Sequence, residues 1–412
     1  MELYSSNQTY KLFHWNMLDM SEVIENCSID SVITDPPYEL NFMGKGWDNS
    51  WIAFQPDTWK KCLDALKPWG YLLAFWWSRT YHRIACAIED AGFEIRDCIM
   101  WLYGSGFPKS MNIWLAIDKK NWVESIDTGI QSQNARPNCD KTNTLYESGT
   151  VGKNFTIKKA TNERAWWWTS LKPSYEPIIV ARKPCEWSCT DNVIKYGVGW
   201  INIDECRVQF WNETDSRVWT DAVMNTEHWF WQEKGNNWNT AVYKEWGRFP
   251  ANTILTYDDS DFKEVCDGFP NNEQRYYYTA KASKRDRDEW LNGEWEKVND
   301  GRNTPIDNPL QRWETLRKNT HPTVKPTDLM QYLVRLVTPN GWTVLDPFNW
   351  SGSTWKAVMY ENKDRNKNYK YIWIELTEEY LPIAKARIEY VINKGVEKSE
   401  QPKEQPLFSN YS

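Results

Sequence analysis

Residues 344–354 read VLDPFNWSGST: an apolar run, a Ser/Gly loop and the start of a helical pattern. A strand that leads through such a loop into a helix brings backbone N–H groups and the helix N-terminus close to a polar ligand. Glu375 ends the next apolar run, YKYIWIE, at roughly the 20-residue spacing where an acidic side chain meets ribose hydroxyls in nucleoside-binding α/β units. No Lys follows Gly352, so ATP hydrolysis is not indicated. Taken alone, the motif also fits an ordinary strand–turn–helix.

Strands and helices alternate on both sides of this motif and again near the N-terminus. Strands are expected at residues 11–15, 29–38, 70–75, 93–103, 342–346 and 369–375. Helices are expected at residues 17–27, 56–67, 79–92, 326–337, 353–361 and 378–394. This alternation predicts an α/β fold, a doubly wound and mostly parallel sheet with helices on its faces. Between about 120 and 315 the pattern dissolves into polar and Asn/Trp-rich loops with short strands such as 175–182.

Composition excludes several classes of protein. The chain has 412 residues, a formal charge of −7 and 41% hydrophobic residues, enough for a sizeable core. It has no apolar run of about 18 residues and no secretory pattern at its N-terminus, so we expect no membrane span. Nine cysteines without dense spacing predict reduced thiols in a cytoplasmic protein. Cys185 and Cys189 lack a second Cys/His pair at ligand spacing, so no metal site is expected.

The tetrapeptide Asp35-Pro36-Pro37-Tyr38 follows an apolar strand. Its two prolines stiffen the loop and leave carbonyls without competing N–H groups. Asp35 adds an acceptor-only carboxylate, and Tyr38 adds an aromatic face. Such a corner suits a planar heterocycle whose NH2 group is hydrogen-bonded while its ring stacks. The residues alone leave open an ordinary turn.

TDPPY (34–38), HPTVKP (321–326) and VLDPFNWSGST with YIWIE (371–375) occur in an order that resembles the amino-group DNA methyltransferases, in their permuted (β) arrangement. The resemblance implies S-adenosylmethionine as cofactor and double-stranded DNA as partner. It implies a catalytic half at 1–120, an inserted target-recognition region at 121–315, a cofactor-binding half at 316–395 and a polar tail at 396–412.

The resemblance also assigns roles to residues. Asp35 and the Pro36 carbonyl would accept hydrogen bonds from the exocyclic amine of a flipped-out base, with Pro37 in the same corner and Tyr38 stacking on the base. Glu375 would hold the ribose. The methionine and sulfonium side would be lined by Asp346, Phe348, Trp350, Ser351 and Gly352. Lys325 would lie near the cofactor carboxylate or the loop, with an exposed lysine at a helix start as the alternative.

A basic segment follows three tyrosines at 276–278 in the predicted insertion. Its cations are candidates to grip phosphates beside stacking aromatic rings, with a solvated loop as the alternative. These cations are Lys281, Lys284, Arg285 and Arg287.

Tryptophan is abnormally frequent, with 28 Trp against only 19 Gly. The family pattern calls for glycine at several of these tryptophans, where backbone must approach a ligand or adopt positive φ. Our hypothesis is that a glycine codon has been rendered as Trp; the rival is a Trp-rich, inactive descendant. The positions concerned are Trp15, Trp69, Trp76, Trp77, Trp114, Trp342, Trp350, Trp355 and Trp373.

The sequence thus predicts a site-specific DNA methyltransferase acting on an exocyclic amino group, with adenine N6 favoured. Cytosine N4 is the near alternative, because both amines offer the same donors. An RNA or protein-glutamine target and a catalytically inactive DNA-binding descendant are further alternatives. A homodimer and a restriction enzyme as partner are left open.

Overall fold

A computed structural model describes residues 2–39, 50–103, 110–124, 126–131, 156–159, 161, 168–208, 247–257, 277–280, 282–291, 296–299, 314–321 and 323–395. The chain forms two compact units. The larger comprises Met1–Ser105, Tyr175–Glu296 and Arg317–Ser412, and the smaller comprises Gly106–Ser174 and Lys297–Leu316.

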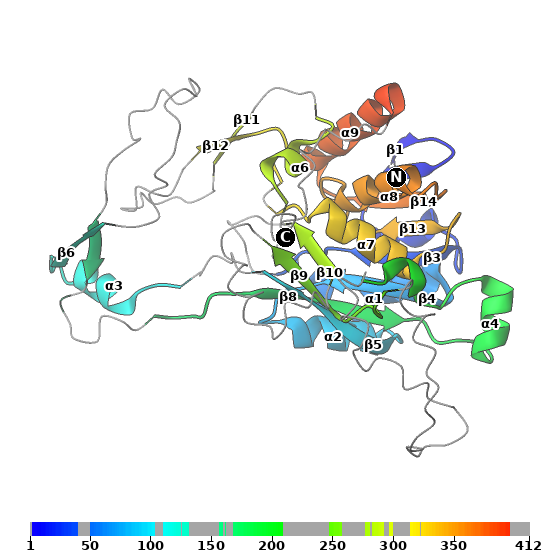
Figure 1. The fold of residues 1–412 in the computed structure, drawn as a ribbon, viewed down its shortest axis with the longest axis horizontal. Helices are drawn as coiled ribbons and strands as arrows, with labels where there is room; N and C mark the ends of the chain where they lie inside the picture. Colours follow the sequence, from blue (N-terminus) through cyan, green and yellow to red (C-terminus); the bar gives the residue numbers. More distant parts are fainter. Residues whose placement is uncertain are drawn as a thin grey trace, which may run out of the picture. The chain divides into compact units, whose positions relative to one another are not determined.

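Within the described residues, the larger unit contains a ten-stranded sheet (Figure 1). Its strands, in spatial order, are β1 (Glu2–Ser6), β2 (Tyr10–His14), β14 (Lys370–Glu375), β13 (Thr343–Asp346), β3 (Ile29–Thr34), β4 (Leu66–Phe75), β8 (Tyr175–Arg182), β5 (Glu94–Leu102), β9 (Thr253–Tyr257) and β10 (Tyr277–Ala280).

The centre of the sheet is parallel. β2, β14, β13, β3 and β4 pair in parallel, as do β5 with β9 and β9 with β10. β8 runs antiparallel to both β4 and β5, and β1 runs antiparallel to β2. The two C-terminal strands β13 and β14 therefore lie between the N-terminal strands β2 and β3. The predicted mostly parallel α/β sheet is confirmed.

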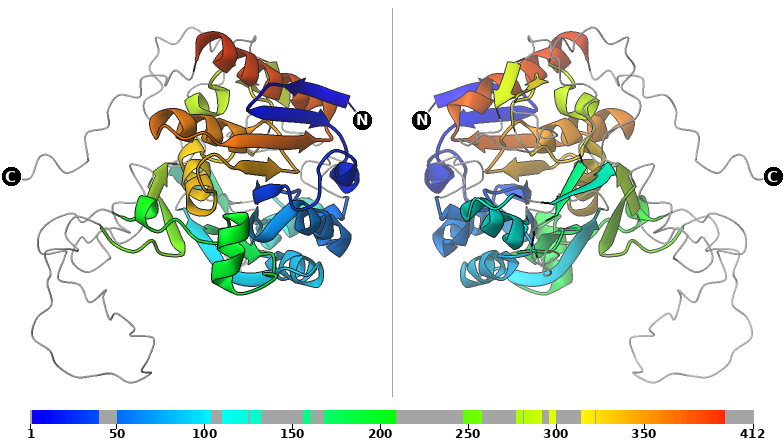
Figure 2. Two further views of the ribbon diagram at one scale, coloured as in Figure 1. Left: turned by 90° about the vertical axis from the view of Figure 1, so that its right-hand side faces the viewer. Right: turned by 90° about the vertical axis from the view of Figure 1, so that its left-hand side faces the viewer.

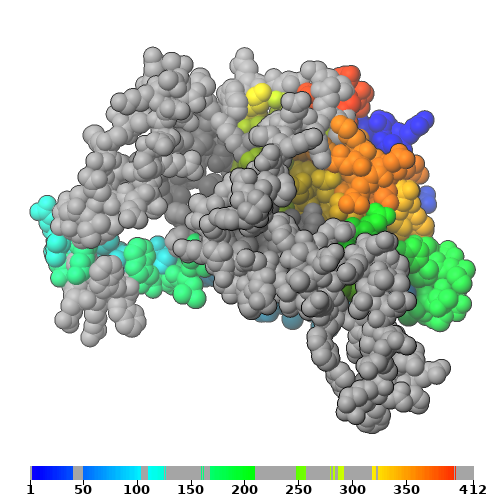
Figure 3. Space-filling model, in the orientation of Figure 1, coloured from blue at the N-terminus to red at the C-terminus, as the bar shows by residue number. Residues whose placement is uncertain are grey.

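Helices cover both faces of this sheet (Figures 1 and 2). Along β4, Leu73 and Phe75 join the core on the side of α7 (Thr327–Val337), α8 (Ser353–Asp364) and α9 (Leu381–Lys394). Leu72 and Ala74 join the core beneath α1 (Pro56–Ala65) and α2 (Tyr81–Asp90). This alternation fits a strand buried on both faces. Figure 3 shows the orange and red surface of α8 and α9 next to the N-terminal strand.

Two predicted helices differ from the structure. Residues 17–27 were expected as a helix, but only the 3-10 helix η1 (Met17–Glu22) forms there. The helix expected at 56–67 ends at Ala65, because Leu66 already pairs with Ile29 as the first residue of β4. Pro68 consequently lies inside a strand instead of closing a helix.

The range 121–315, expected as an irregular insertion, supplies β8, β9 and β10 to the main sheet. The compact units follow other bounds than the four predicted parts, whose functional assignment stays a prediction. The predicted tail 396–412 lies outside the described residues. The other described elements are η4 (Ile52–Phe54), α3 (Ile113–Lys120), β6 (Ile126–Gln131), β7 (Thr156–Lys159), α4 (Cys189–Tyr196), η5 (Asp204–Cys206), α6 (Lys284–Asp288), β11 (Glu296–Asn299), β12 (Glu314–Arg317) and η7 (Glu378–Tyr380).

Candidate active site

The strand order brings the two distant motifs to one edge of the sheet. β3 ends just before Asp35, and its parallel neighbour β13 ends at Asp346. β14, parallel to β13, ends at Glu375. The carboxyl ends of parallel strands are where open α/β sheets bind ligands, above all where the strand order reverses. The chain's two α/β halves meet at such a point, between β13 and β3 (Figure 1).

Asp346 ties these two halves together. Its Oδ1 accepts hydrogen bonds from the Thr34 hydroxyl at 2.7 Å and from the Phe348 N–H at 3.1 Å. Its Oδ2 accepts a hydrogen bond from the Thr354 hydroxyl at 2.6 Å. Burial raises the pKa of Asp346 to about 6, although the two hydroxyls act against it. The carboxylate thus holds the loop between β13 and α8 against the end of β3.

Glu375 is buried beside the same loop. Its Oε2 accepts a hydrogen bond from the Trp350 N–H at 2.5 Å, and its Oε1 accepts one from the Thr377 N–H at 2.7 Å. Burial raises the pKa of Glu375 to about 8, although both N–H groups act against it. Each carboxylate oxygen has two lone pairs, so each can still accept a further hydrogen bond.

The remaining predicted cofactor residues shape the loop. Gly352 adopts φ +81° immediately before α8, a conformation that glycine takes without strain. Ser351 is buried, and its carbonyl accepts a hydrogen bond from Arg387 Nη1 at 2.5 Å. Phe348 packs, half-buried, against the core beneath α1 and α2.

Lys325 is buried in the Asp-Pro-Pro-Tyr corner. Its Nζ donates to Asp35 Oδ2 at 2.7 Å and to the Tyr38 hydroxyl at 3.0 Å. Its side chain is only 7% exposed, so the alternative of an exposed lysine at the start of a helix is wrong. Burial acts to lower the pKa of Lys325, but the nearby carboxylates outweigh it and raise that pKa. Pro36 and Pro37 are buried beside this pair.

Asp35 keeps one oxygen uncommitted. Its Oδ1 is buried and has no hydrogen-bond partner among the residues that the structure describes. Burial raises the pKa of Asp35, with the Lys325 ammonium opposing this shift. Because a buried acceptor without a donor costs free energy, this oxygen is available to accept a hydrogen bond from a further donor.

Sequence reasoning missed Glu176, the second residue of β8. Its Oε2 accepts a hydrogen bond from the Tyr38 hydroxyl at 3.2 Å and lies 3.4 Å from Lys325 Nζ. Its Oε1 accepts a hydrogen bond from the Tyr103 hydroxyl at 3.3 Å. Since β8 runs antiparallel to β4, the beginning of β8 lies at the edge where the parallel strands end. The only available signal was the Glu at the start of the apolar run YEPIIVAR.

Trp350 spans the distance between the two motifs. Its backbone N–H contacts Glu375, while its indole Nε1 donates to the Asp35 carbonyl at 2.6 Å. Its ring lies 5.1 Å from that of His321 and 6.0 Å from that of Tyr380, centroid to centroid. The indole therefore fills the space that runs from Glu375 to the Asp-Pro-Pro-Tyr corner.

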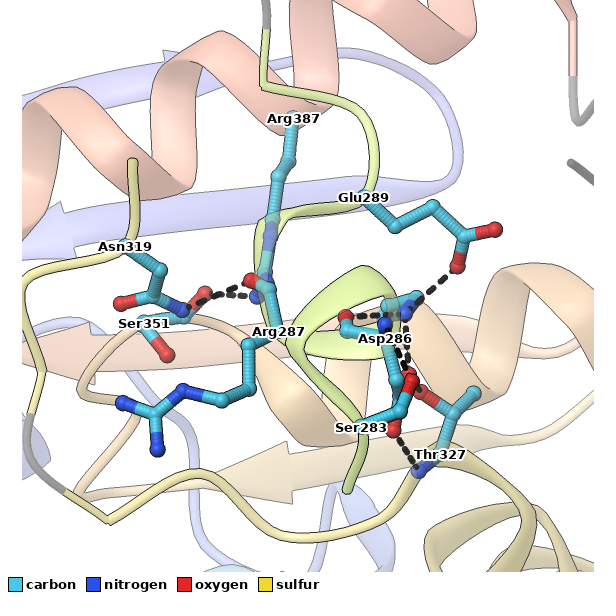
Figure 4. Close-up of polar contacts among 9 residues, drawn as sticks. Ser283, Asp286, Arg287, Glu289, Asn319, Thr327, Ser351 and Arg387 are labelled. Carbon is cyan, nitrogen blue, oxygen red and sulfur yellow. Dashed lines mark hydrogen bonds and ion pairs between the residues drawn. The ribbon is translucent and has the colours of Figure 1, made fainter. Parts of the chain in front are cut away.

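The segment with the predicted DNA-binding cations is fixed to the second half of the chain (Figure 4). Asp286, in α6, binds Lys356 Nζ at 2.5 Å and accepts a hydrogen bond from the Thr327 hydroxyl at the start of α7. Arg287 is half-buried, and its Nη2 donates to the His321 carbonyl at 2.7 Å. Arg387 Nη2 donates to the Arg287 carbonyl at 2.6 Å.

Contact between these cations and DNA stays a prediction. Lys281 lies outside the described residues, and so do the side chains of Lys284 and Arg285. Among the described residues, no group of three or more His, Cys, Asp or Glu side chains is placed to hold a metal ion. No helix within the described ranges is long and apolar enough to cross a membrane.

Comparison with known proteins shows the family to which this chain belongs. The family model described as DNA methylase, for N6 and N4 methyltransferases, matches residues 29–386. The match takes in most of the chain, so the chain belongs to this DNA methylase family.

Individual relatives are more distant. The type II methyltransferase M.HpaI of Haemophilus parainfluenzae is 30% identical over 104 residues, which are 23% of this chain and 32% of M.HpaI. M2.DpnII of Streptococcus pneumoniae is 27% identical over 130 residues, 30% of this chain and 45% of M2.DpnII. The chain thus spans less than half the length of either relative. The structure of the cytosine-N4-specific PvuII DNA methyltransferase is 13% identical, with a TM-score of 0.45, covering 96% of this chain and 89% of the other.

Proposed function

We propose that this chain is an S-adenosylmethionine-dependent, site-specific DNA methyltransferase that acts on an exocyclic amino group, with adenine N6 as the favoured target. One observation carries the proposal: the Asp-Pro-Pro-Tyr corner after β3 and the buried Glu375 at the end of β14 lie on either side of β13, at the same edge of the sheet, joined through the loop that Asp346 holds. Family membership supports S-adenosylmethionine as the methyl donor. Cytosine N4 is the second candidate, since its amine presents the same two N–H donors.

The residues of the Asp-Pro-Pro-Tyr corner would position the target amine. Asp35 Oδ1 and the Pro36 carbonyl would accept the two N–H groups of the target amine, which directs the nitrogen lone pair outward. The ring of Tyr38 would stack on the extruded base. Bound S-adenosylmethionine would supply the methyl group as an electrophilic sulfonium carbon. Asp35 also offers a carboxylate for the proton that the nitrogen must release.

The polar residues fit a nucleoside cofactor, but the indole of Trp350 does not. Glu375 keeps free lone pairs for ribose hydroxyls, and Gly352 lets the loop approach a ligand. The Trp350 ring, however, is hydrogen-bonded across the same space. We therefore propose that the expressed protein carries glycine at residue 350.

Backbone geometry supports glycine at other tryptophans as well. Among the described residues, eight that are not glycine have positive φ, and five of these eight are tryptophans. Bulky side chains rarely adopt this conformation, whereas glycine does so freely. The indole N–H groups of Trp15, Trp69, Trp355 and Trp373 are also buried without an acceptor in the described part of the chain. The five with positive φ are Trp51, Trp69, Trp122, Trp290 and Trp350.

Transfer of a labelled methyl group from S-adenosylmethionine into duplex DNA tests the proposed activity. We expect incorporation that Asp35→Ala abolishes and that Asp64→Ala, a substitution in an exposed pair with Lys60, leaves intact. Nucleoside analysis of the product then identifies N6-methyladenine or N4-methylcytosine. Salt-sensitive DNA binding without any cofactor binding would instead establish the inactive descendant.

Mass spectrometry of the natively expressed protein tests the glycine proposal. We expect peptides that cover residues 350, 355 and 373 to have the masses of glycine. Unchanged indoles at these three positions would refute it. We also propose a restriction enzyme or a second copy of the chain as a partner. The support for this is the likeness to two type II methyltransferases.

A further inference from the structure

Glu176 places a second carboxylate in the Asp-Pro-Pro-Tyr corner. It comes from β8, which lies far along the chain from both Asp35 and Lys325. Its side chain is 17% exposed, so water screens it only partly. Two carboxylates therefore face one ammonium, and the ionised cluster carries a net negative charge.

The contacts show how the ammonium is shared. Lys325 Nζ lies 2.7 Å from Asp35 Oδ2 and 3.4 Å from Glu176 Oε2. The Tyr38 hydroxyl accepts a hydrogen bond from Lys325 and donates one to Glu176. Without Glu176, Lys325 would form a neutral one-to-one pair with Asp35, and that pair would be a weaker acceptor for an incoming amine.

We propose that Glu176 is a positioning residue of the methyl-transfer site: it shares the Lys325 ammonium and fixes the Tyr38 hydroxyl, so that the corner keeps a net negative charge and Asp35 keeps its free Oδ1 for the target amine. This inference rests on the proposed function. With S-adenosylmethionine bound, positive charge would pass to the amine nitrogen as its lone pair forms the bond to the methyl carbon and the carbon–sulfur bond pair returns to sulfur. A net negative corner stabilises that charge until the nitrogen releases its proton.

A urea-unfolding cycle on the cofactor-free protein tests the sharing of the ammonium. Glu176→Gln is compared in two backgrounds, Lys325 and Lys325→Met. With Lys325 present, we expect Glu176→Gln to lower the unfolding midpoint, because it removes a partner of the ammonium. With Met at 325, we expect it to raise the midpoint, because it removes repulsion from Asp35. Equal shifts in both backgrounds would show that Glu176 only packs, and would overturn the proposal.

Kinetics give the second test. In protein that methylates DNA, we expect Glu176→Gln to lower kcat about 10- to 100-fold while the KM for DNA and for cofactor changes less than about threefold. Glu176→Asp should recover part of kcat. The matched control is Glu94→Gln, which removes a carboxylate that pairs with Arg182 at the other end of β8 and should leave kcat unchanged. A kcat for Glu176→Gln equal to that of the parent would refute the role.

The two tests separate two kinds of failure. If the protein with glycine at residue 350 and its Asp35→Ala variant are equally inactive, the proposed function fails, and the urea cycle still decides whether Glu176 shares the ammonium. If the parent is active and the cycle shows no coupling, the proposal about Glu176 fails alone.

Discussion

Replacement of Trp350 by glycine should open the cofactor position. To admit a ligand, the indole must give up its hydrogen bond to the Asp35 carbonyl, worth about 1 kcal/mol, and its ring contacts with His321 and Tyr380, about 0.5–1.5 kcal/mol each. The sum is about 2–4 kcal/mol that cofactor binding must overcome. We therefore expect Trp350→Gly to tighten cofactor binding by about 30- to 1000-fold.

Folding stability should fall by at most about 3 kcal/mol in the same variant. The lost indole contacts destabilise the fold, but glycine relieves a positive φ of +51°, which costs a bulky residue about 1–2 kcal/mol. Isothermal titration with S-adenosylmethionine measures the affinity, and urea unfolding measures the stability.

Trp122→Gly is the matched control. Trp122 has φ +58° and is 96% exposed in the smaller unit, so it tests relief of strain without opening the site. We expect it to leave cofactor affinity unchanged. An affinity of Trp350→Gly within about threefold of the parent would refute the reasoning that the indole obstructs the cofactor.

Four further predictions follow from the buried charges. Burial raises the pKa of Glu375 to about 8, so cofactor affinity should rise between about pH 6 and 9 and lose this dependence in Glu375→Gln; a flat profile in the parent would contradict it. Between the ordinary glutamate pKa of about 4.3 and a pKa of about 8, the folded protein binds more protons at Glu375 than the unfolded chain does. Glu375 therefore makes the free energy of unfolding fall as the pH rises through that window. Glu375→Gln should remove this slope in urea titrations. Lys356→Met should cost about 3–5 kcal/mol in urea unfolding, because it removes the ammonium that neutralises the Asp286 and Glu289 carboxylates, and a loss below about 1 kcal/mol would contradict this. Arg387→Met should weaken cofactor binding about tenfold by releasing the Ser351 carbonyl, and unchanged affinity would show that the loop holds without it.

The parallel centre of the sheet could be predicted because its strands are continuous apolar runs that end in polar motifs. β14 ends at Glu375, as the sequence indicated, whereas β3 ends at Thr34, four residues before the expected end at 38. Parallel strands buried on both faces carry this signal without any tertiary information. The prediction of a helix at 17–27 was wrong beyond Glu22. The short 3-10 helix η1 already buries the apolar residues Met17 and Met20 against the core, so a longer helix is not needed there.

The partners of the Asp-Pro-Pro-Tyr corner could not be predicted. Lys325 follows HPTV with no apolar pattern that would mark it as buried, and only the fold brings it to Asp35. Glu176 opens a strand in a region without regular order, and its position depends on β8 running antiparallel between β4 and β5. Hydrogen bonds between residues more than 100 positions apart leave no local trace in a sequence.

The positive φ of Trp350 and the obstruction of the candidate site by its indole have one physical cause. A loop that must bring backbone N–H groups to Glu375 needs a left-handed residue at 350, and the backbone adopts that conformation although Trp is there. The indole points toward the Asp35 carbonyl, to which its Nε1 donates a hydrogen bond. The same backbone with glycine keeps the N–H contact to Glu375 and leaves the space toward Asp35 free. The positive φ of residue 350 therefore fits the proposed cofactor loop, and only the indole of residue 350 works against that proposal.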